Sequence, residues 1–327
     1  MGLRVVSTVP LPAEVRVEVV GEEVEIEVPL LADGSREETI NRVKSGGGAN
    51  GLVSWTDAVD EMLLDACGDG LRVVANCAVG FDNIDLEACA RRGVTACNTP
   101  DMVTDGTADI AWALLLGAAR RVGEGDRFAR SGAWAKQGTL GPAEFLGAPI
   151  AGQTLVIVGA GRIGYATALR SIGWGMKVLY VSRASKPAYE LAPLNAERVT
   201  LEEGLERGDF ISVHTPLTEE TRHLIGEREL GLCKATAVIV STARGPVIDE
   251  GALARALRNG VIGAAGLDVF ESEPRLHPEL VELENTLFTP HIGSADTRCR
   301  RKMVELCAKN IEAVLNGREP LTPIAGS

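Results

Sequence analysis

The sequence predicts an α/β protein in which a doubly wound parallel sheet domain is inserted into a smaller, flavodoxin-like α/β domain. Short β-branched segments alternate with helical segments along most of the chain, which favours parallel sheets. The length of 327 residues corresponds to about two domains at ~150 residues each. Thr-Pro steps at 99–100 and 289–290 bracket the middle of the chain.

The first hundred residues predict the smaller α/β domain. Four β-branched runs are typical of strands: 3–8, 51–55, 71–80 and 94–98. The segment DLEACARRG at 85–93 predicts a helix that ends at Gly93.

The middle of the chain predicts the doubly wound, Rossmann-type domain. A long apolar helix begins near Asp101, and 152–183 reads as a strand, a glycine turn, a helix and a second strand within ~30 residues. Thr200 and Glu203 form a capping box. The remaining expected elements are strands at 209–214, 235–242 and 262–270, and helices at 249–260 and 294–317.

The Thr-Pro steps place the domain boundaries. Proline fixes its own φ and favours an extended residue before it, which suits a chain crossing between domains. We therefore expect a dinucleotide-binding domain at 101–289 and a substrate domain made of 1–100 and 290–327.

Composition excludes several function classes. The net charge of −12 argues against general affinity for nucleic acid or anionic membranes. Seven cysteines without a CxxC pair predict free thiols in a reducing cytoplasm, and we expect no metal site. The start MGLRVVST lacks the apolar core of a secretory signal, and the longest apolar run, 110–119, is shorter than the ~18 residues of a membrane span.

The motif GAGRIG carries the first functional hypothesis. Gly159 permits a tight turn, Gly161 lets the backbone approach a pyrophosphate, and Gly164 lets the helix pack on the strand. The helix start offers free N–H groups to phosphates. A tight turn without a ligand is the alternative, but the strand before, the helix after and the second strand favour a dinucleotide.

The second strand ends in Ser182 and Arg183, where an acidic residue would bind the ribose of NAD. A carboxylate there would repel the 2′-phosphate of NADP, whereas serine and arginine can bind it, with Ser185 and Lys186 close by. Solvated loop residues are the alternative. The position at the ribose end favours NADP(H), with NAD(H) also possible.

His291 is the histidine with a functional context. His214, His223 and His277 have structural interpretations as a strand end, a helix surface and a proline-flanked loop, although His214 could face the cofactor. His291 follows Pro290 at the expected domain junction.

Two charged residues are expected near His291. Arg244 and Glu273 each follow the end of a predicted strand, where a doubly wound sheet forms its ligand crevice. Arginine can clamp a carboxylate, and a carboxylate beside a histidine stabilises the protonated ring. A surface ion pair is the alternative for both residues.

Several segments together resemble one family. They follow in order over nearly the whole chain: VANCAVGFDNIDLEACARRGV, NTPDMVTDGTADIAWALLLGAARR, VGAGRIG, STARGPVID, GLDVFESEP and TPHIGS. They resemble the D-isomer-specific 2-hydroxyacid dehydrogenases, and most of all the glyoxylate/hydroxypyruvate reductase branch.

The resemblance implies residue roles. Arg244 orients the substrate carboxylate and carbonyl, His291 protonates the carbonyl oxygen, Glu273 tunes His291, and the turn at Val79 and Gly80 holds the carboxylate through N–H groups. It also implies cofactor contacts at Thr104, Arg162, Ile163, Thr215, Pro216, Thr242, Asp268 and Gly293.

Some positions depart from relatives. Ser241 stands where many relatives have asparagine, and Val79 stands where phosphite dehydrogenases carry lysine, which argues against phosphite. Trp134 matches a region that crosses to the partner subunit in related dimers, so the resemblance implies a homodimer; a buried core tryptophan is the alternative.

The leading hypothesis is an NADPH-preferring reductase of glyoxylate and hydroxypyruvate. The alternatives are another D-2-hydroxyacid dehydrogenase, acting on D-lactate, D-glycerate or a bulkier 2-oxo acid, and a nucleotide-sensing protein similar to the C-terminal-binding corepressors.

Overall fold

The computed structural model describes residues 3–12, 14–29 and 36–326. The chain divides into two compact units. Unit 1 comprises Met1–Val103 and Ala295–Ser327, and unit 2 comprises Thr104–Ser294. Each unit has its own sheet and its own hydrophobic core.

Unit 1 is built on a six-stranded sheet of order β2-β3-β1-β4-β5-β6 among the described residues. Among the strand pairs that the described residues form in this unit, only β2–β3 is antiparallel. The order β3-β1-β4-β5-β6 is that of flavodoxin-like folds, which confirms the predicted class, with β2 added at the edge. The strands are β1 (Val5–Ser7), β2 (Arg16–Val19), β3 (Glu22–Glu27), β4 (Gly51–Ser54), β5 (Val73–Asn76) and β6 (Thr95–Cys97).

The described part of unit 1 also contains the helices α1 (Arg36–Ser45), α2 (Glu61–Cys67), α3 (Leu86–Arg91) and the C-terminal α13 (Thr297–Leu315). Aspartates cap three of them, because Asp60, Asp85 and Asp296 accept hydrogen bonds from N–H groups in the first turns of α2, α3 and α13. Gly93 adopts φ +64° just after α3, as expected for a residue that ends a helix.

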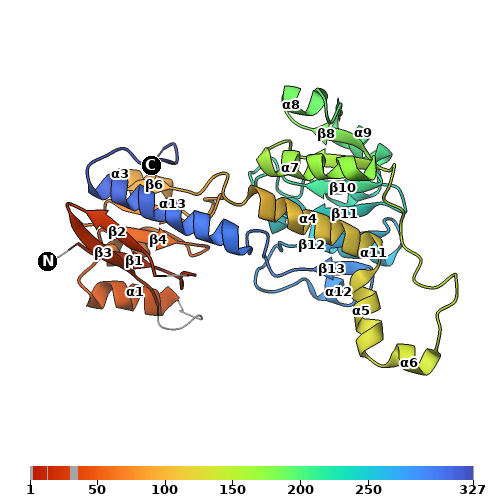
Figure 1. Cartoon of the computed structure of the whole chain (residues 1–327), viewed down its shortest axis with the longest axis horizontal. Helices are drawn as coiled ribbons and strands as arrows, with labels where there is room; N and C mark the ends of the chain where they lie inside the picture. Colours follow the sequence, from red (N-terminus) through yellow and green to blue (C-terminus); the bar gives the residue numbers. More distant parts are fainter. Residues whose placement is uncertain (1–2, 13, 30–35, 327) are drawn as a thin grey trace. The chain divides into compact units, whose positions relative to one another are not determined.

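Unit 2 contains a parallel seven-stranded sheet of order β13-β12-β11-β10-β7-β8-β9 (Figure 1). The order reverses at β7, so the sheet is doubly wound as predicted. The strands are β7 (Thr154–Val158), β8 (Lys177–Val181), β9 (Glu197–Arg198), β10 (Phe210–Val213), β11 (Val238–Ser241), β12 (Ala264–Leu267) and β13 (Thr286–Phe288).

Both faces of this sheet are buried. Along β7, Leu155 and Ile157 belong to one apolar cluster, and Val156 and Val158 belong to another. This alternation is the period of two that places successive side chains on opposite faces. The helices and 3-10 turns of unit 2 are α4 (Thr104–Ala119), α5 (Val122–Arg130), α6 (Ala133–Gln137), α7 (Arg162–Arg170), η1 (Ser171–Trp174), α8 (Pro187–Glu190), α9 (Leu201–Arg207), α10 (Glu227–Leu230), η2 (Gly245–Val247), α11 (Glu250–Arg258) and α12 (Pro278–Val281).

The unit boundaries fall a few residues beyond the expected ones. The first break lies at Val103, because Thr104 already begins α4. The second lies after Ser294, because residues from Thr289 to Gly293 are hydrogen-bonded to Asp268 of unit 2.

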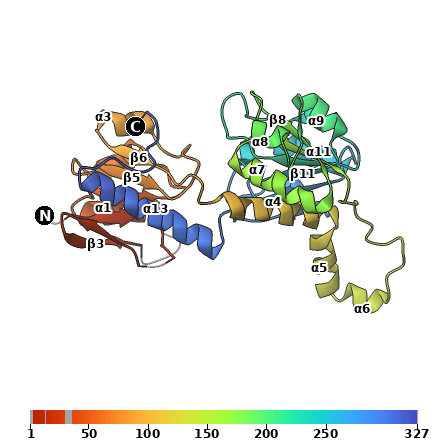
Figure 2. The same cartoon turned by 45° about the horizontal axis from the view of Figure 1, so that its top comes forward.

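An arm made of α5, α6 and the following loop projects from the sheet of unit 2 in both views (Figures 1 and 2). Neither helix of the arm buries a residue. Trp134 is 52% exposed, so the alternative of a buried core tryptophan is wrong. Among the described residues, no helix combines the length and apolar character that a membrane crossing requires.

Candidate active site

The glycine turn follows β7 as predicted. Gly159 has φ +100°, and a Cβ there would lie 2.7 Å from the backbone carbon of His214. A Cβ on Gly164 would lie 2.4 Å from the carbonyl oxygen of Gly159, so this glycine permits close packing of α7 on the turn. At both Gly159 and Gly164, close backbone contacts within the fold therefore exclude a larger residue.

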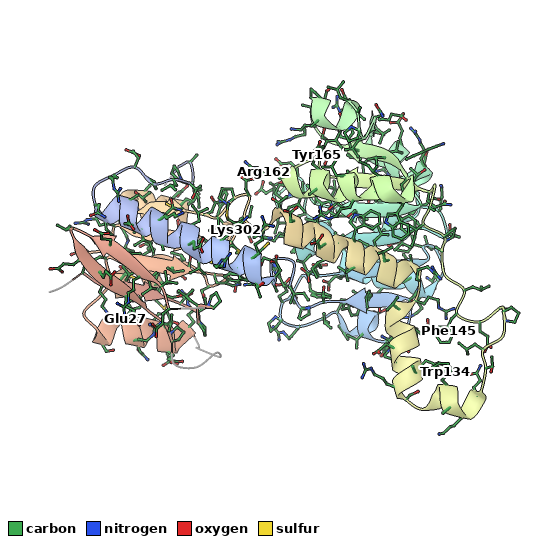
Figure 3. The ribbon with its side chains drawn as sticks, in the orientation of Figure 1. Glu27, Trp134, Phe145, Arg162, Tyr165 and Lys302 are labelled. Atoms are coloured by element: carbon green, nitrogen blue, oxygen red, sulfur yellow. The ribbon has the colours of Figure 1, made fainter. Side chains whose placement is uncertain are left out.

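Gly161 differs from Gly159 and Gly164. A Cβ at this position would meet nothing within 4 Å, so packing does not explain the glycine. Gly161 is also the N-cap of α7 and provides no side-chain cap for the helix. Open space in front of N–H groups at a helix start suits a pyrophosphate. Arg162 and Ile163 are the first residues of α7, and Figure 3 labels Arg162 there.

The loop after β8 holds the residues expected at the ribose end. Ser182 donates a hydrogen bond to the carbonyl of Ala184, and the side chain of Arg183 is exposed. The guanidinium of Arg198 donates to the backbone carbonyls of Ser182 (3.2 Å) and Arg183 (2.8 Å). These contacts fix the backbone and leave the Arg183 side chain at the surface.

A carboxylate that the sequence analysis did not single out lies behind this loop. Glu190 accepts hydrogen bonds from the hydroxyls of Tyr180 and Ser185, the latter at 2.9 Å. The Tyr180 oxygen in turn accepts from the N–H of Lys186 at 2.9 Å. The proton of Ser185 is therefore directed at Glu190, so Ser185 braces the loop.

His291 and Glu273 form the expected pair. Nδ1 of His291 lies 2.8 Å from Oε2 of Glu273, and the other carboxylate oxygen accepts from the N–H of Phe270 at 2.9 Å. Burial acts to raise the pKa of Glu273, but the bonds from His291 and Phe270, with the charges of His291 and Arg244, lower it overall. Nδ1 is thus engaged by Glu273, and Nε2 is the ring nitrogen on the opposite side of the ring.

Asp268 builds the backbone that carries His291. Its two oxygens accept from the N–H groups of Ile292 and Gly293, each at 2.8 Å, and from the hydroxyl of Thr289 at 2.6 Å. His291 has φ 52°, a left-handed conformation that a histidine rarely adopts without support. Asp268 and Gly293, expected as cofactor contacts, thus have a structural task within the unit.

Arg244 lies near Glu273. The following residue, Gly245, could not carry a Cβ, which would lie 1.9 Å from the backbone carbon of Phe270. This close approach places the Arg244 loop against the segment that leads to Glu273, and the charge of Arg244 helps to lower the pKa of Glu273. Arg244 and Glu273 therefore lie on adjoining loops beyond the carboxyl ends of β11 and β12.

A pocket of about 300 Å³ adjoins this group. It is lined by Phe270, Glu273, Pro274, Leu276, Phe288, Thr289, Pro290 and His291. A larger pocket of about 800 Å³ lies at the opposite, amino ends of the strands. Ligands of doubly wound sheets bind beyond the carboxyl ends of the strands, and the smaller pocket lies on that side.

Three residues expected near the cofactor also lie beyond the carboxyl ends of strands. Thr215 and Pro216 follow β10, and the hydroxyl of Thr215 donates to the carbonyl of Val158 at 3.1 Å. Thr242 follows β11. Thr104, by contrast, begins α4.

Two other histidines have structural settings. Burial lowers the pKa of His214 to about 3, and its ring contacts Ser212 (2.8 Å) and Thr242 (3.4 Å), so it stays neutral at the end of β10. His223 was expected on a helix surface, and this expectation is wrong. The residue lies in a turn with φ 51°, where its ring is 3.2 Å from Glu271.

Glu271 also ties this loop to the start of α11. It exchanges hydrogen bonds with Glu250, each carboxylate accepting from the other residue's N–H at 2.9 and 2.6 Å. This brace of the loop between Phe270 and Glu273 was missed by sequence reasoning. Nothing in the local pattern indicated it.

In unit 1, the turn at Val79 and Gly80 follows β5. Within the described part of the chain, no residue accepts a hydrogen bond from the N–H of Val79 or of Gly80. Adjacent unused N–H groups form a site suited to an anion.

Comparison with known proteins identifies the family to which this chain belongs. The profile of the D-isomer-specific 2-hydroxyacid dehydrogenase NAD-binding domain matches residues 112–293. The chain belongs to the D-isomer-specific 2-hydroxyacid dehydrogenases. It is therefore an oxidoreductase that uses a nicotinamide cofactor, and its relatives place it in the glyoxylate reductase branch.

Individual relatives of this dehydrogenase agree. It is 50% identical over 267 residues to a glyoxylate reductase of Thermococcus litoralis, covering 81% of this chain and 80% of the relative. A solved structure from Thermus thermophilus is 41% identical with a TM-score of 0.86, covering 99% of this chain and 100% of the other. An NADPH-dependent glyoxylate/hydroxypyruvate reductase from Sinorhizobium meliloti, solved with NADP and malonate, is 28% identical with a TM-score of 0.81, covering 99% and 97%.

Proposed function

We propose that this dehydrogenase is an NADPH-preferring reductase of small 2-oxo acids, with glyoxylate and hydroxypyruvate as substrates. The observation that carries the proposal is the 2.8 Å contact between His291 and Glu273 beside a pocket at the carboxyl edge of the sheet. Such a pair supplies a proton where a carbonyl oxygen gains negative charge.

Each residue has a distinct task in the proposed reaction. Arg244 pairs with the substrate carboxylate and orients the carbonyl, since a guanidinium binds a carboxylate through two parallel hydrogen bonds. In unit 1, the N–H groups of Val79 and Gly80 would hold a substrate carboxylate. Nε2 of His291 donates a proton to the carbonyl oxygen, and Glu273 orients the ring through its contact at Nδ1.

The residues present suit a dinucleotide. The open space at Gly161 and the uncapped start of α7 are where a pyrophosphate would lie. NADPH, when bound, supplies the hydride. Thr215, Pro216 and Thr242, beyond the ends of β10 and β11, would contact it from the adjoining strands.

The loop after β8 supports a preference for NADPH. Ser182 and Arg183 occupy the place where NAD-specific sites carry a carboxylate. The nearby Glu190 is engaged by Tyr180 and Ser185. Arg183 also lies close enough to Glu220 to help lower its pKa, after the larger effect of a hydrogen bond from Thr218. A 2′-phosphate would provide a second partner for that guanidinium.

The test is a substrate panel. The enzyme is mixed with NADPH and with glyoxylate, hydroxypyruvate or pyruvate, and the loss of nicotinamide absorbance is followed. We expect turnover of glyoxylate and hydroxypyruvate and slower turnover of pyruvate. Activity on pyruvate or a bulkier 2-oxo acid alone would assign the enzyme to another branch, and no turnover at all would refute the proposal.

We also propose a cytoplasmic homodimer formed through the arm of α5 and α6. On this arm and its following loop, Trp134, Leu146 and Val122 are 52%, 67% and 57% exposed, and exposed apolar side chains of this size suit an interface (Figure 3 labels Trp134). All seven cysteines are free thiols, as in a reducing compartment. Sedimentation velocity tests the dimer: wild type should sediment as a dimer and Trp134→Glu as a monomer. A monomeric wild type would contradict it.

A further inference from the structure

The turn after β5 is held on one side by its carbonyl groups. The carbonyl oxygen of Ala78 accepts from the N–H of Thr99 at 3.0 Å. The next carbonyl, of Val79, accepts from the side-chain amide of Asn98 at 2.7 Å. The third, of Gly80, accepts from the side-chain amide of Asn76 at 2.7 Å.

These carbonyls determine where the N–H groups point. In a planar trans peptide the C=O of one residue and the N–H of the next point in opposite directions. Thr99, by holding the Ala78 carbonyl, therefore fixes the N–H of Val79. Asn98, by holding the Val79 carbonyl, fixes the N–H of Gly80.

The donors are themselves held in place. Asn76 is fully buried, and its amide oxygen accepts from the hydroxyl of Ser54 at 3.0 Å. The backbone carbonyl of Asn98 accepts from the hydroxyl of Thr322 at 2.7 Å, and that hydroxyl accepts from the buried amide of Asn310 at 2.8 Å. A buried amide of this kind is costly unless its bonds are made.

We propose that Asn98 is a positioning residue that sets the affinity for the substrate carboxylate, because its bond to the Val79 carbonyl presents the N–H of Gly80 in a fixed orientation. This inference rests on the proposed function, in which that turn holds the carboxylate. Asn98 does not touch the reacting atoms; it acts through the peptide group that it holds. Donors that are already fixed lose little conformational entropy when an anion binds, so the anion is bound more tightly.

The experiment compares three substitutions in the full-length enzyme. Asn98→Asp keeps the shape and removes the donor, and Asn98→Ala removes the donor without adding charge. Asn50→Asp is the matched control, because Asn50 makes the same kind of bond to the carbonyl of Gly70 (3.1 Å) at the opposite, amino edge of the same sheet. For each variant we measure kcat and KM for glyoxylate, the affinity for NADPH, and the affinity for oxalate by titration calorimetry with NADP⁺ present.

Both Asn98 variants should raise the glyoxylate KM and the oxalate Kd by about tenfold, the usual effect of one lost hydrogen bond. Their kcat and their NADPH affinity should stay close to wild type. The Asn50 variant should leave the KM, the oxalate Kd, the kcat and the NADPH affinity unchanged. The inference is overturned if KM and oxalate affinity are unchanged in both Asn98 variants, or if Asn50→Asp weakens them equally. A wild type that binds oxalate but reduces no 2-oxo acid would refute the proposed function alone.

Discussion

Nδ1 of His291 lies 2.8 Å from Oε2 of Glu273, and the backbone that carries this histidine is anchored by the buried carboxylate of Asp268. One carboxylate therefore positions the loop and a second one orients the ring. This division of tasks leads to separate predictions for the proton donor and for its partner.

Replacing the proposed proton donor should affect chemistry more than binding. We expect His291→Asn to lower kcat for glyoxylate by about 10²–10⁴-fold, the usual contribution of a positioned general acid. Cofactor affinity, measured by fluorescence titration with NADPH, should stay within about twofold because no phosphate contact is lost. A variant with near-normal kcat would remove His291 from the proposed role.

The partner of His291 makes stability depend on pH in one direction. The pKa of Glu273 is lowered below its ordinary value of 4.5 in the folded protein. Such a group stabilises the fold above pH 4.5 and loses this contribution as the pH falls through the lowered folded value. Urea unfolding should show wild type exceeding Glu273→Gln in free energy of unfolding at neutral pH, with the difference shrinking under acid. A difference that grows as the pH falls would contradict this assignment.

The glycine turn offers a matched pair of substitutions. Gly161→Ala places its methyl group in open space, whereas Gly164→Ala places it 2.4 Å from the carbonyl oxygen of Gly159. Thermal unfolding without ligand should show Gly164→Ala losing stability and Gly161→Ala remaining close to wild type. Titration with NADPH should nevertheless show weaker binding for Gly161→Ala. Normal binding by that variant would mean that no pyrophosphate lies at Gly161.

The sequence predicted the features that depend on local order. The strand β7, the turn at Gly159 and the helix α7 follow one another directly, so glycine spacing was sufficient. Arg244 and Glu273 could be predicted because the carboxyl ends of neighbouring parallel strands lie at one edge. The antiparallel pair β2–β3 was not expected, although the alternation of Val17 and Val19 with charged residues signalled a strand.

The long-range hydrogen bonds could not be predicted from the sequence. The side chain of Asn98 reaches the carbonyl of Val79 only because β5 and β6 are paired. Asp268 was expected beside the cofactor, yet its oxygens hold the backbone of Ile292 and Gly293. Ser185 was expected to face a phosphate, yet its hydroxyl is directed at Glu190. When a polar side chain has several hydrogen-bond partners within reach, tertiary packing decides which of them it contacts. The pattern of a single sequence does not contain this information.

The most direct test of the account is the ratio of kcat/KM with NADPH to that with NADH, at saturating glyoxylate, in wild type and in Arg183→Ala. We predict a wild-type ratio well above one. The Arg183 variant should lose about ten- to hundredfold in that ratio, through the NADPH value alone, since one charge-assisted contact is worth about 1.5–3 kcal/mol. A wild-type preference for NADH, or equal losses with both cofactors, would contradict the account.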